Sequence, residues 1–418
     1  MSIYLKRLIE SEIEDQMQVA GGLVIEGPKW CGKSTTVKRI AKSIVELQYK
    51  DIFDKYKLFA TNDSRKLLEG DKPLMFDEWQ KIPELWDAIR ADTDATRLKG
   101  QYILTGSAKP IEDNSRHSGT GRIVKLFMRP MSLYESLEST GEVSLGELFQ
   151  GNHDISGETA LNIERLSYLT CRGGWPESIN MSDKNALLAA KNYHKSLVEE
   201  DITGVDEIKR NPERARRILR AYARQVSTLA SNRTIKSDVE SGGVDEKTLS
   251  SYLNAFRKLF VIEDILAWSP KLRSKTAIRS SEKRQFVDPS LAAQALGATP
   301  TTLLDDIKTF GFLFESLCSR DLRIYAESLG GKIFHYRDNN NLEADIIIQL
   351  NNGDWGAVEI KLGGFQIDSA AENLLKLTEK INTEFMHKPK FLMVLTGINY
   401  AYRRKDGVLV VPIGCLKN

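Results

Sequence analysis

Apolar and polar positions divide the chain into stretches with different periodicities. Near its start, three short apolar runs have the pattern of strands buried in a parallel sheet, namely residues 22–26, 73–76 and 102–104. Residues 4–17 and 34–47 carry apolar side chains at helical spacing and predict helices that cover this sheet. From residue 159 to 259 the pattern is mainly helical, and beyond residue 309 strand and helix patterns alternate. The chain is therefore predicted to be an α/β protein with a helical middle region.

The helical middle region ends in a pattern typical of a winged helix. Helices are predicted over 212–231, 235–240 and 245–259, with Gly242 and Gly243 as the turn before the last of them. A strand over 260–265, a basic stretch and a second strand at 285–287 would follow as a β-hairpin. In this arrangement the longer helix is the recognition element.

The last section predicts an α/β domain of its own. Its expected helices and strands cover 311–325, 333–337, 342–348, 355–362, 367–381 and 390–395. Glycines between residues 140 and 158 are typical of a linker. We therefore expect four regions, with bounds 1–139, 140–204, 205–300 and 301–418.

Composition excludes several classes of protein. At 418 residues, 41% hydrophobic and 28% charged, the chain resembles a globular protein of two or three domains. Its net charge of +2 gives no global attraction to nucleic acid, so such affinity must come from local patches. No apolar run approaches the roughly 18 residues of a membrane helix, so no membrane partner is expected. The four separated cysteines are expected to be reduced thiols of a cytoplasmic protein.

Residues 27–34 carry the clearest chemistry. They match G-x-x-x-x-G-K-S, the phosphate-binding loop, and lie between a predicted strand and a predicted helix, as that loop requires. The glycines let backbone N–H groups approach phosphates, and the helix N-terminus adds positive potential. We therefore expect ATP here, with Lys33 on the outer phosphates and Ser34 on Mg²⁺. The expected nucleotide contacts are Gly27, Pro28, Lys29, Trp30, Cys31, Gly32, Lys33, Ser34 and Thr35.

A second set of polar residues follows the neighbouring predicted strands. Asp77 and Glu78 end the second apolar run. In P-loop ATPases such an Asp assists Mg²⁺, so we assign Asp77 to the metal and Glu78 to the base that activates water. A solvated acidic turn is the alternative interpretation. Thr105, at the end of the third run, is the candidate that senses the terminal phosphate or orients the water, with Ser107 as the alternate; either can instead cap a turn.

The basic stretch up to residue 284 is the candidate contact with DNA. The winged-helix prediction places the following cations on the wing: Lys271, Arg273, Lys275, Arg279, Lys283 and Arg284. A basic stripe is the electrostatic footprint of a nucleic-acid contact. A helical spacer with a solvated basic loop, or a protein-contact module, is compatible with the same residues.

The C-terminal region contains a spacing typical of metal-dependent nucleases. Asp345 is followed by Glu359 and Lys361 on the next predicted strand, where alternation places both on one face. This is the core of restriction-endonuclease-like folds: two carboxylates hold a hard cation that activates water, and the lysine assists. Glu315 on the preceding helix can add a carboxylate, and Gln366 a polar group. A solvated strand face is the alternative.

Taken together, these motifs resemble those of bacterial and archaeal AAA+-type ATPases whose C-terminal half is an uncharacterised module with a restriction-endonuclease-like core. The resemblance spans nearly the whole chain and rests on GPKWCGKS, MFDEWQKIPELWD, YILTGS, GTGR with FMRPMSLYE, CRGGWPE, EADIIIQL with WGAVEIKL, and DGVLVVPI. Trp30 and Cys31 replace variable positions of the commoner loop GPRQVGKT. The implied fold is a three-layer P-loop AAA+-type domain, a winged-helix middle region and a restriction-endonuclease-like C-terminal domain.

The resemblance also implies a homo-oligomer, with a hexamer as one size of such a ring, in which an arginine enters a neighbouring active site. Arg122 in GTGR is the first candidate, and Arg116 and Arg129 are the alternates; an ion-paired surface arginine is the other interpretation. The leading hypothesis is a Mg²⁺-dependent ATPase whose nucleotide state drives a DNA-engaging C-terminal half, with branched or single-stranded DNA, in repair or defence, as the substrate class. The alternatives are a regulatory switch with an inactive nuclease-like scaffold, and an ATP-gated metal nuclease.

Overall fold

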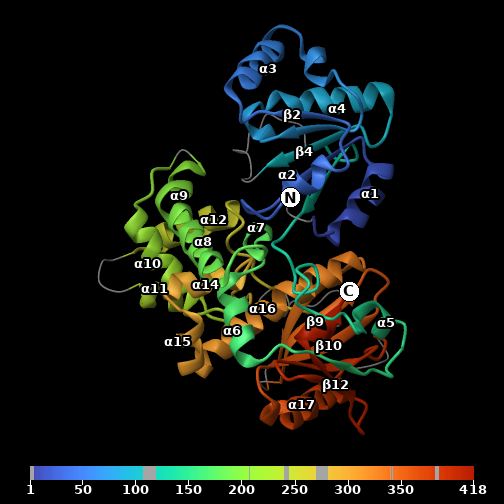
Figure 1. Cartoon of the computed structure of the whole chain (residues 1–418), viewed down its shortest axis with the longest axis vertical. Helices are drawn as coiled ribbons and strands as arrows, with labels where there is room; N and C mark the ends of the chain where they lie inside the picture. The colour runs from blue at the N-terminus through green and yellow to red at the C-terminus, as the bar shows by residue number, and fades with distance from the viewer. Residues whose placement is uncertain are drawn as a thin grey trace.

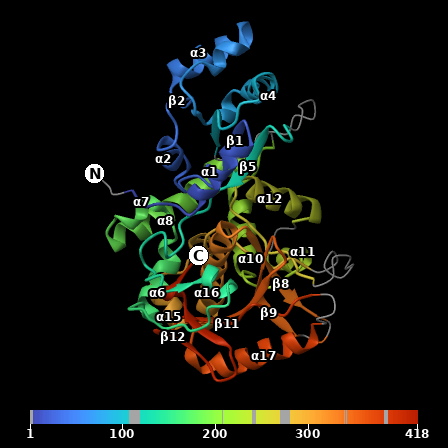
Figure 2. The same cartoon turned by 90° about the vertical axis from the view of Figure 1, so that its right-hand side faces the viewer.

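Two β-sheets lie toward opposite ends of the molecule, and the middle helices lie to one side, at the level between the two sheets (Figure 1, Figure 2). The computed structural model describes residues 4–106, 119–206, 208–239, 244–269, 281–338, 340, 342–381 and 386–418. In the part of the chain that it describes, no helix is long and apolar enough to cross a membrane.

The N-terminal sheet has five strands in the order β2–β3–β4–β1–β5. They are β1 (Gly22–Glu26), β2 (Ser43–Glu46), β3 (Leu74–Asp77), β4 (Tyr102–Gly106) and β5 (Ile123–Phe127). All neighbours are parallel, so their carboxyl ends share one edge of the sheet. Apolar residues of α1 (Ile9–Val19) and α2 (Lys33–Lys38) pack on one face, and those of α3 (Lys50–Asn62) and α4 (Glu84–Thr96) pack on the other. The predicted three-layer α/β domain is confirmed.

The helix predicted over 34–47 is wrong in its second half. Helix α2 ends at Lys38, and Ser43–Glu46 forms the edge strand β2, which pairs with β3. The apolar positions of this segment fit a helical face as well as a strand. As a strand, the segment pairs with β3 and buries Val45 in the core under α3. A helix here would lose the hydrogen bonds to β3.

The C-terminal sheet has seven strands in the order β7–β12–β13–β11–β10–β9–β8. They are β7 (Gly157–Glu158), β8 (Gly331–Arg337), β9 (Glu343–Leu350), β10 (Trp355–Lys361), β11 (Leu392–Thr396), β12 (Tyr400–Arg403) and β13 (Leu409–Pro412). Helices α16 (Ile307–Ser328) and α17 (Ile367–Lys380) pack on opposite faces: Ile346 and Val358 point toward α16, whereas Ile347 and Ala357 point toward α17. These two helices and strands β8 to β11 match the elements that the sequence predicts.

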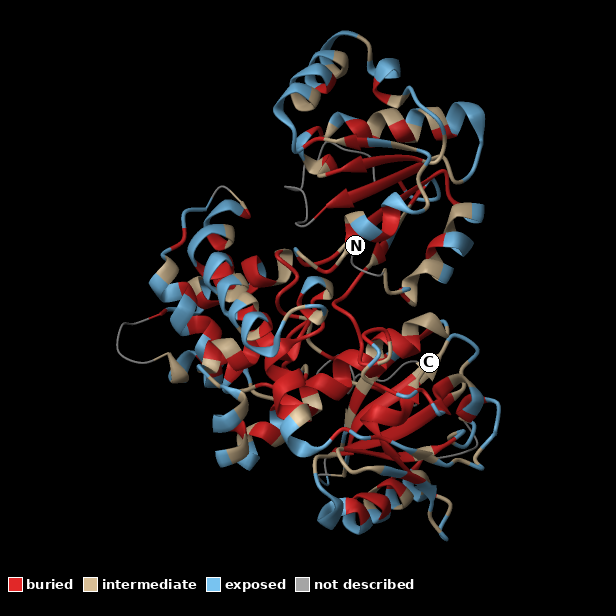
Figure 3. Cartoon of the chain, viewed as in Figure 1, coloured by how far each residue is buried: buried red, intermediate tan, exposed pale blue. Residues whose placement is uncertain are grey.

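Residues 140–158, expected to be a linker, contribute strands to the C-terminal half. Strand β6 (Val143–Ser144) pairs with β14 (Leu416–Lys417), and β7 pairs with β12. A further core cluster extends from Leu133 to Leu416 and includes residues of the middle helices, whereas the N-terminal sheet has two clusters of its own. Figure 3 shows this burial in the middle helices and the C-terminal sheet together. The middle and C-terminal regions therefore share one core.

The middle region is built from short helices. They are α5 (Leu145–Phe149), α6 (Ile163–Arg172), α7 (Pro176–Ile179), α8 (Asp183–Ser196), the π-helical turn η3 (Leu197–Asp201), α9 (Ile202–Gly204), α10 (Pro212–Ala223), α11 (Asn232–Asp238), α12 (Glu246–Lys258), α14 (Pro289–Leu296) and α15 (Pro300–Asp305). After α12, isolated antiparallel bridges join Ile262 to Phe286 and Ile265 to Lys283. The predicted helices around α10 to α12 are thus present, although α10 is shorter than expected.

The predicted wing is corrected at its second edge. Lys283 and Arg284 are buried, and neither belongs to a solvated basic loop. Arg284 donates to the Ala230 carbonyl (2.8 Å) and forms an ion pair with Asp264 (3.3 Å). The remaining candidates of the wing, Lys271, Arg273, Lys275 and Arg279, and the turn at Gly242 and Gly243, lie outside the described residues.

Candidate functional site

The phosphate-binding loop connects β1 to α2 at the carboxyl edge of the N-terminal sheet. Gly27 and Gly32 adopt positive φ angles of 154° and 98°, and a Cβ on Gly27 would lie 2.1 Å from a backbone oxygen of the chain after β5. The Lys33 ammonium donates to the carbonyls of Gly27 (2.9 Å) and Pro28 (2.7 Å). The loop lysine is therefore held by neutral dipoles and has no carboxylate partner among the described residues.

Three predicted residues meet at the ends of α2, β3 and β4. The Ser34 hydroxyl donates to Asp77 Oδ1 at 2.8 Å, and the Thr105 hydroxyl donates to the same oxygen at 2.6 Å. Asp77 and Thr105 are buried, whereas Thr35 is exposed. Serine and carboxylate oxygens are ligands that Mg²⁺ prefers, so Ser34 and Asp77 fit the metal predicted here. The alternate to Thr105, Ser107, lies outside the described residues.

Glu78 follows β3 in a left-handed conformation, with φ 57° and ψ 42°. A non-glycine residue pays roughly 1–3 kcal/mol for such a backbone, which persists where the surroundings impose it. Its carboxylate accepts a hydrogen bond from Gln80 Nε2 at 2.5 Å and remains partly exposed. The left-handed backbone at Glu78 therefore ends β3 and changes the direction of the chain directly after Asp77.

The variable positions of the loop contact the middle region. Lys29 Nζ forms an ion pair with Asp201 Oδ1 at 2.5 Å, at the end of η3. The Trp30 ring stacks against Trp175 and Tyr193, with centroids 6.3 and 6.1 Å away. Trp30 itself has φ 69°. Lys29 and Trp30, at variable positions of the motif, therefore connect the P-loop to the chain before α7, to α8 and to η3.

The CRGGWPE segment supplies this contact surface. A Cβ on Gly174 would lie 2.0 Å from the Met131 carbonyl oxygen, so only glycine fits. The Gly174 N–H donates to buried Asp288 (2.9 Å), which is also paired with Arg320 (2.9 Å). These bonds fix the backbone that presents Trp175 to the loop. The motif is structural support for the P-loop.

The three arginine candidates have different surroundings. Arg122 is exposed and pairs with Asp94 at 2.7 Å. Its carbonyl accepts from Gly22, the first residue of β1, so it lies at the amino edge of the sheet, opposite the loop. Arg129 is buried, and all three nitrogens of its guanidinium group donate to Glu263 and Glu327, so none is available to a neighbouring subunit. Arg116 lies outside the described residues.

The predicted C-terminal residues meet where the start of β9 lies beside the end of β10, with contacts to both α16 and α17. Lys361 Nζ lies 2.7 Å from Glu359 Oε2 and 3.3 Å from Asp345 Oδ2. Lys283 Nζ lies 2.5 Å from Glu315 Oε1 and 3.2 Å from Asp345 Oδ1. We call these five residues the carboxylate cluster. Gln366, in a 3₁₀ turn before α17, is exposed and makes no side-chain hydrogen bond within the described chain.

Charges within the carboxylate cluster compensate one another. Burial raises the pKa of Glu359 to about 8 and that of Glu315 to about 7, and the Asp345 charge adds to both effects. Burial opposes ionisation of Asp345 as well, yet Lys283 and Lys361 hold its pKa well below its usual range. Asn373 of α17 donates to Glu359 at 2.8 Å. The cluster is a buried ionic network.

The carboxylate cluster as it stands does not fit a metal ion. Lys283 sits between Glu315 and Asp345, so an ammonium already occupies the space between two carboxylates. Across the described ranges, no group of three or more histidine, cysteine, aspartate or glutamate side chains is arranged to hold a metal. Sequence reasoning missed Lys283, because 62 residues separate it from Asp345 and its neighbours suggest a basic loop.

Family comparisons divide the chain into three matched stretches. Residues 21–137 match an AAA domain, residues 163–302 match a domain of unknown function (DUF8612), and residues 310–416 match another (DUF4143). With the loop, the strand ends and the parallel sheet already described, the first match identifies the N-terminal region as an AAA-type P-loop ATPase domain. Domains of this class bind and hydrolyse ATP.

Similar proteins come from bacteria and archaea. Uncharacterized proteins of Mycobacterium bovis and Mycobacterium tuberculosis are each 24% identical over 345 residues, covering 81% of this chain and 70% of theirs. Among solved structures, a Walker-type ATPase of Pyrococcus abyssi is 15% identical, with a TM-score of 0.41, and covers 70% of this chain and 96% of its own.

Proposed function

We propose that the chain is a Mg²⁺-dependent ATPase whose nucleotide state governs engagement of DNA by the middle and C-terminal regions. The observation that carries this proposal is the direct contact of the P-loop with the middle region. Lys29 is paired with Asp201, and Trp30 is stacked on Trp175 and Tyr193. Phosphates that reshape the loop would therefore change its contacts with α8. Single-stranded or branched DNA is the proposed partner.

The residues at the loop have distinct proposed roles. Lys33 exchanges two carbonyl acceptors for the outer phosphates of ATP, which bear more negative charge. Ser34 and Asp77 would hold Mg²⁺, and the ion would supply positive charge against the charge that develops on the phosphates. Glu78 would accept a proton from the attacking water, and Thr105, which keeps Asp77 oriented, would sense the terminal phosphate or orient that water.

Arg122 is proposed to act in a neighbouring copy of the chain. Its place at the amino edge of the sheet, away from its own P-loop, supports action between subunits. Its exposed ion pair with Asp94 is weak enough to be exchanged for a phosphate. A homo-oligomer, with a ring of six as one arrangement, is the assembly that this role requires.

A second candidate function is a regulatory switch with an inactive nuclease-like scaffold. The observation that favours it is Lys283, which fills the space between Glu315 and Asp345. In that switch the C-terminal region transmits protein contacts and cuts nothing. The ATP-gated nuclease, the third hypothesis, would require Lys283 to leave the carboxylate cluster.

The test combines two assays in one tube. Phosphate release is measured with and without single-stranded, duplex and branched DNA, and nicking is scored in the same samples with Mg²⁺ or Mn²⁺. DNA-stimulated hydrolysis without nicking supports the first proposal. Hydrolysis unaffected by every DNA favours the switch, and metal-dependent nicking lost in Lys361→Ala favours the nuclease. No hydrolysis by the purified chain under any of these conditions would overturn the ATPase assignment.

A further inference from the structure

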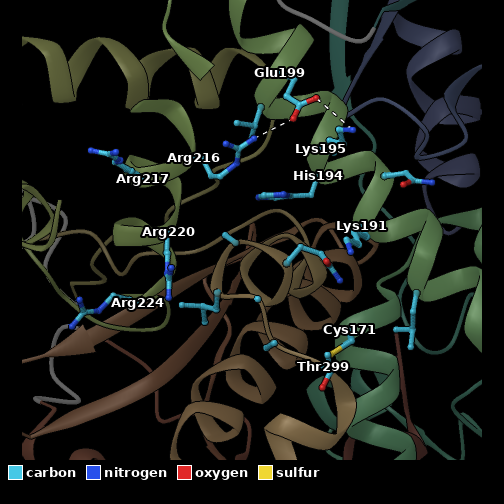
Figure 4. A pocket seen from close by; sticks show the side chains of 18 of the residues that line it. Cys171, Lys191, His194, Lys195, Glu199, Arg216, Arg217, Arg220, Arg224 and Thr299 are labelled. Atoms are coloured by element: carbon cyan, nitrogen blue, oxygen red, sulfur yellow. Dashed lines mark hydrogen bonds and ion pairs between the residues drawn. The ribbon is translucent and has the colours of Figure 1, made fainter. Parts of the chain in front are cut away.

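We propose that a groove between α8 and α10 binds the phosphate backbone of a nucleic-acid strand. The groove measures about 1390 Å³ and is also lined by the chain between α14 and α15. Figure 4 shows its cationic side chains in two groups, from Arg216 to Arg224 on one side and from Lys191 to Lys195 on the other. We call it the basic groove. This inference rests on the proposed function in one respect, namely that the polyanion in the groove is a nucleic acid.

One row of cations comes from α10. Arg216, Arg217, Arg220 and, at the C-cap, Arg224 all line the basic groove. Arg217, Arg220 and Arg224 are three and four residues apart and so share one face of the helix. Arginine presents a planar fork of donors that matches phosphate oxygens, which suits this row to a phosphodiester backbone.

The opposite row comes from α8. Lys184, Lys191 and Lys195 lie along α8, and the first and last are eleven positions apart, or about 16 Å of helix at about 1.5 Å per residue. At roughly 3.4 Å of axis per nucleotide in one strand, this row faces about four or five phosphates. Both the length of the row and the volume exceed what one small anion needs, since pockets for small ligands measure roughly 300–1,000 Å³.

Acidic side chains compensate only part of this charge. Glu199, Glu213 and Asp238 also line the groove and pair with Arg216, Arg217, Arg224 and Lys195. Lys184, Lys191 and Arg220 form no ion pair with any described residue. Three uncompensated cations in one concave surface attract a polyanion.

The residue types of the lining further specify the ligand. Of the described side chains that line the groove, none is phenylalanine, tyrosine or tryptophan, so there is no platform on which bases would stack. The groove is therefore built to contact backbone and sugar, and binding should depend little on base sequence.

The groove is also adjacent to the nucleotide loop. Helix α8 carries Lys191 and Lys195 toward the groove and Tyr193 toward Trp30 of the P-loop. Asp201, the partner of Lys29, ends the π-helical turn that continues α8. A strand in the groove would thus lie against the same helix that contacts the ATP site.

The test measures binding of labelled single-stranded and duplex oligonucleotides of mixed sequence by fluorescence anisotropy across a salt series. The test variant is Lys184→Gln with Lys191→Gln and Arg220→Gln, which removes the three uncompensated cations. We expect at least about a tenfold loss of affinity, and a log affinity against log salt slope that is shallower by about 2–3, since each lost phosphate contact contributes roughly 0.7–0.9. The matched control removes three exposed lysines of the N-terminal domain, Lys55→Gln with Lys57→Gln and Lys66→Gln.

The outcomes separate this inference from the proposed function. The groove is overturned if the groove and control variants bind with equal affinity and equal slope, while neutralising Lys271, Arg273 and Lys275 lowers the affinity for DNA. That result would leave DNA engagement itself in place. Loss in the groove variant, with ATP hydrolysis indifferent to DNA, would support the groove and overturn the coupling. Binding of inorganic tripolyphosphate without binding of any oligonucleotide would overturn the proposal for a strand.

Discussion

The P-loop and the carboxylate cluster each hold a buried lysine, but in opposite electrostatic settings. Lys33 is bonded to two neutral carbonyls, whereas Lys283 is bonded to two carboxylates. Exchanging a carbonyl for a phosphate oxygen strengthens the bonds of a lysine, but removing a lysine from between carboxylates leaves buried charge uncompensated. The first arrangement suits a site that exchanges ligands, and the second suits a site that keeps its own cation.

The largest expected effect is on catalysis at the P-loop. Lys33→Ala should lower ATP hydrolysis by about 10²-fold or more, because it removes the cation aimed at the outer phosphates. The measurement is phosphate release at saturating ATP. Lys38→Ala is the matched control, since Lys38 lies on the same short helix but pairs with Glu46 at the surface. Equal rates in parent and Lys33→Ala would contradict the assignment.

The next largest effect is on stability at the carboxylate cluster. Lys283→Met should reduce the free energy of unfolding by about 3–5 kcal/mol, because Glu315 and Asp345 would lose their shared cation. Urea unfolding followed by circular dichroism measures this change. Lys332→Met, an exposed lysine on neighbouring β8, should change it little. Adding Glu315→Gln to Lys283→Met should recover part of the loss, and no recovery would argue against direct coupling.

A smaller effect concerns pH. The pKa values of Glu315 and Glu359 are raised from 4.5 to about 7 and about 8 in the folded protein. Between about pH 4.5 and 8 the folded state therefore holds protons that the unfolded chain has released, and stability falls as pH rises through this window. Glu359→Gln should flatten that fall. Melting temperatures at pH 5.5 and pH 8.5, compared between parent and variant, are the measurement, and identical pH dependence would contradict the raised pKa.

The smallest expected effect is at the junction between the loop and the middle region. Lys29→Met removes a half-exposed ion pair worth about 0.2–1 kcal/mol, so basal hydrolysis should stay within about twofold. Stimulation by DNA should fall, and Asp201→Asn should reproduce the change. Lys50→Met, which alters an exposed lysine at the start of α3, is the control. Unaltered stimulation in both variants would separate this ion pair from the coupling.

Local motifs explain why much of the nucleotide site could be predicted. Lys33 and Ser34 lie within one contiguous loop, and the parallel sheet brings Asp77 and Thr105 to the same edge. Asp345 and Glu359 lie on consecutive antiparallel strands that pair side by side, and alternation along β10 places Glu359 and Lys361 on one face. Such residues are placed by secondary structure, and the pattern of the sequence contains that information.

Long-range contacts explain what could not be predicted. Lys283 enters the carboxylate cluster from a segment without periodicity, so no pattern distinguishes it from the basic residues before it. Strands β6 and β7 have two residues each, too few to show alternation. Trp30 occupies a variable loop position, and its role depends on the distant rings of Trp175 and Tyr193. In each case the partner is supplied by tertiary packing.

Arg129 has a consequence for synthesis of the chain on the ribosome. Its partners Glu263 and Glu327 follow it by 134 and 198 residues. At roughly 5–20 residues per second, the second partner emerges about 10–40 seconds after the arginine. For the first 134 residues of that interval, the nascent ATPase domain carries a cation destined for burial before either of these two carboxylates has been made. The ion pairs of Arg129 can therefore be completed only after α16 has been made.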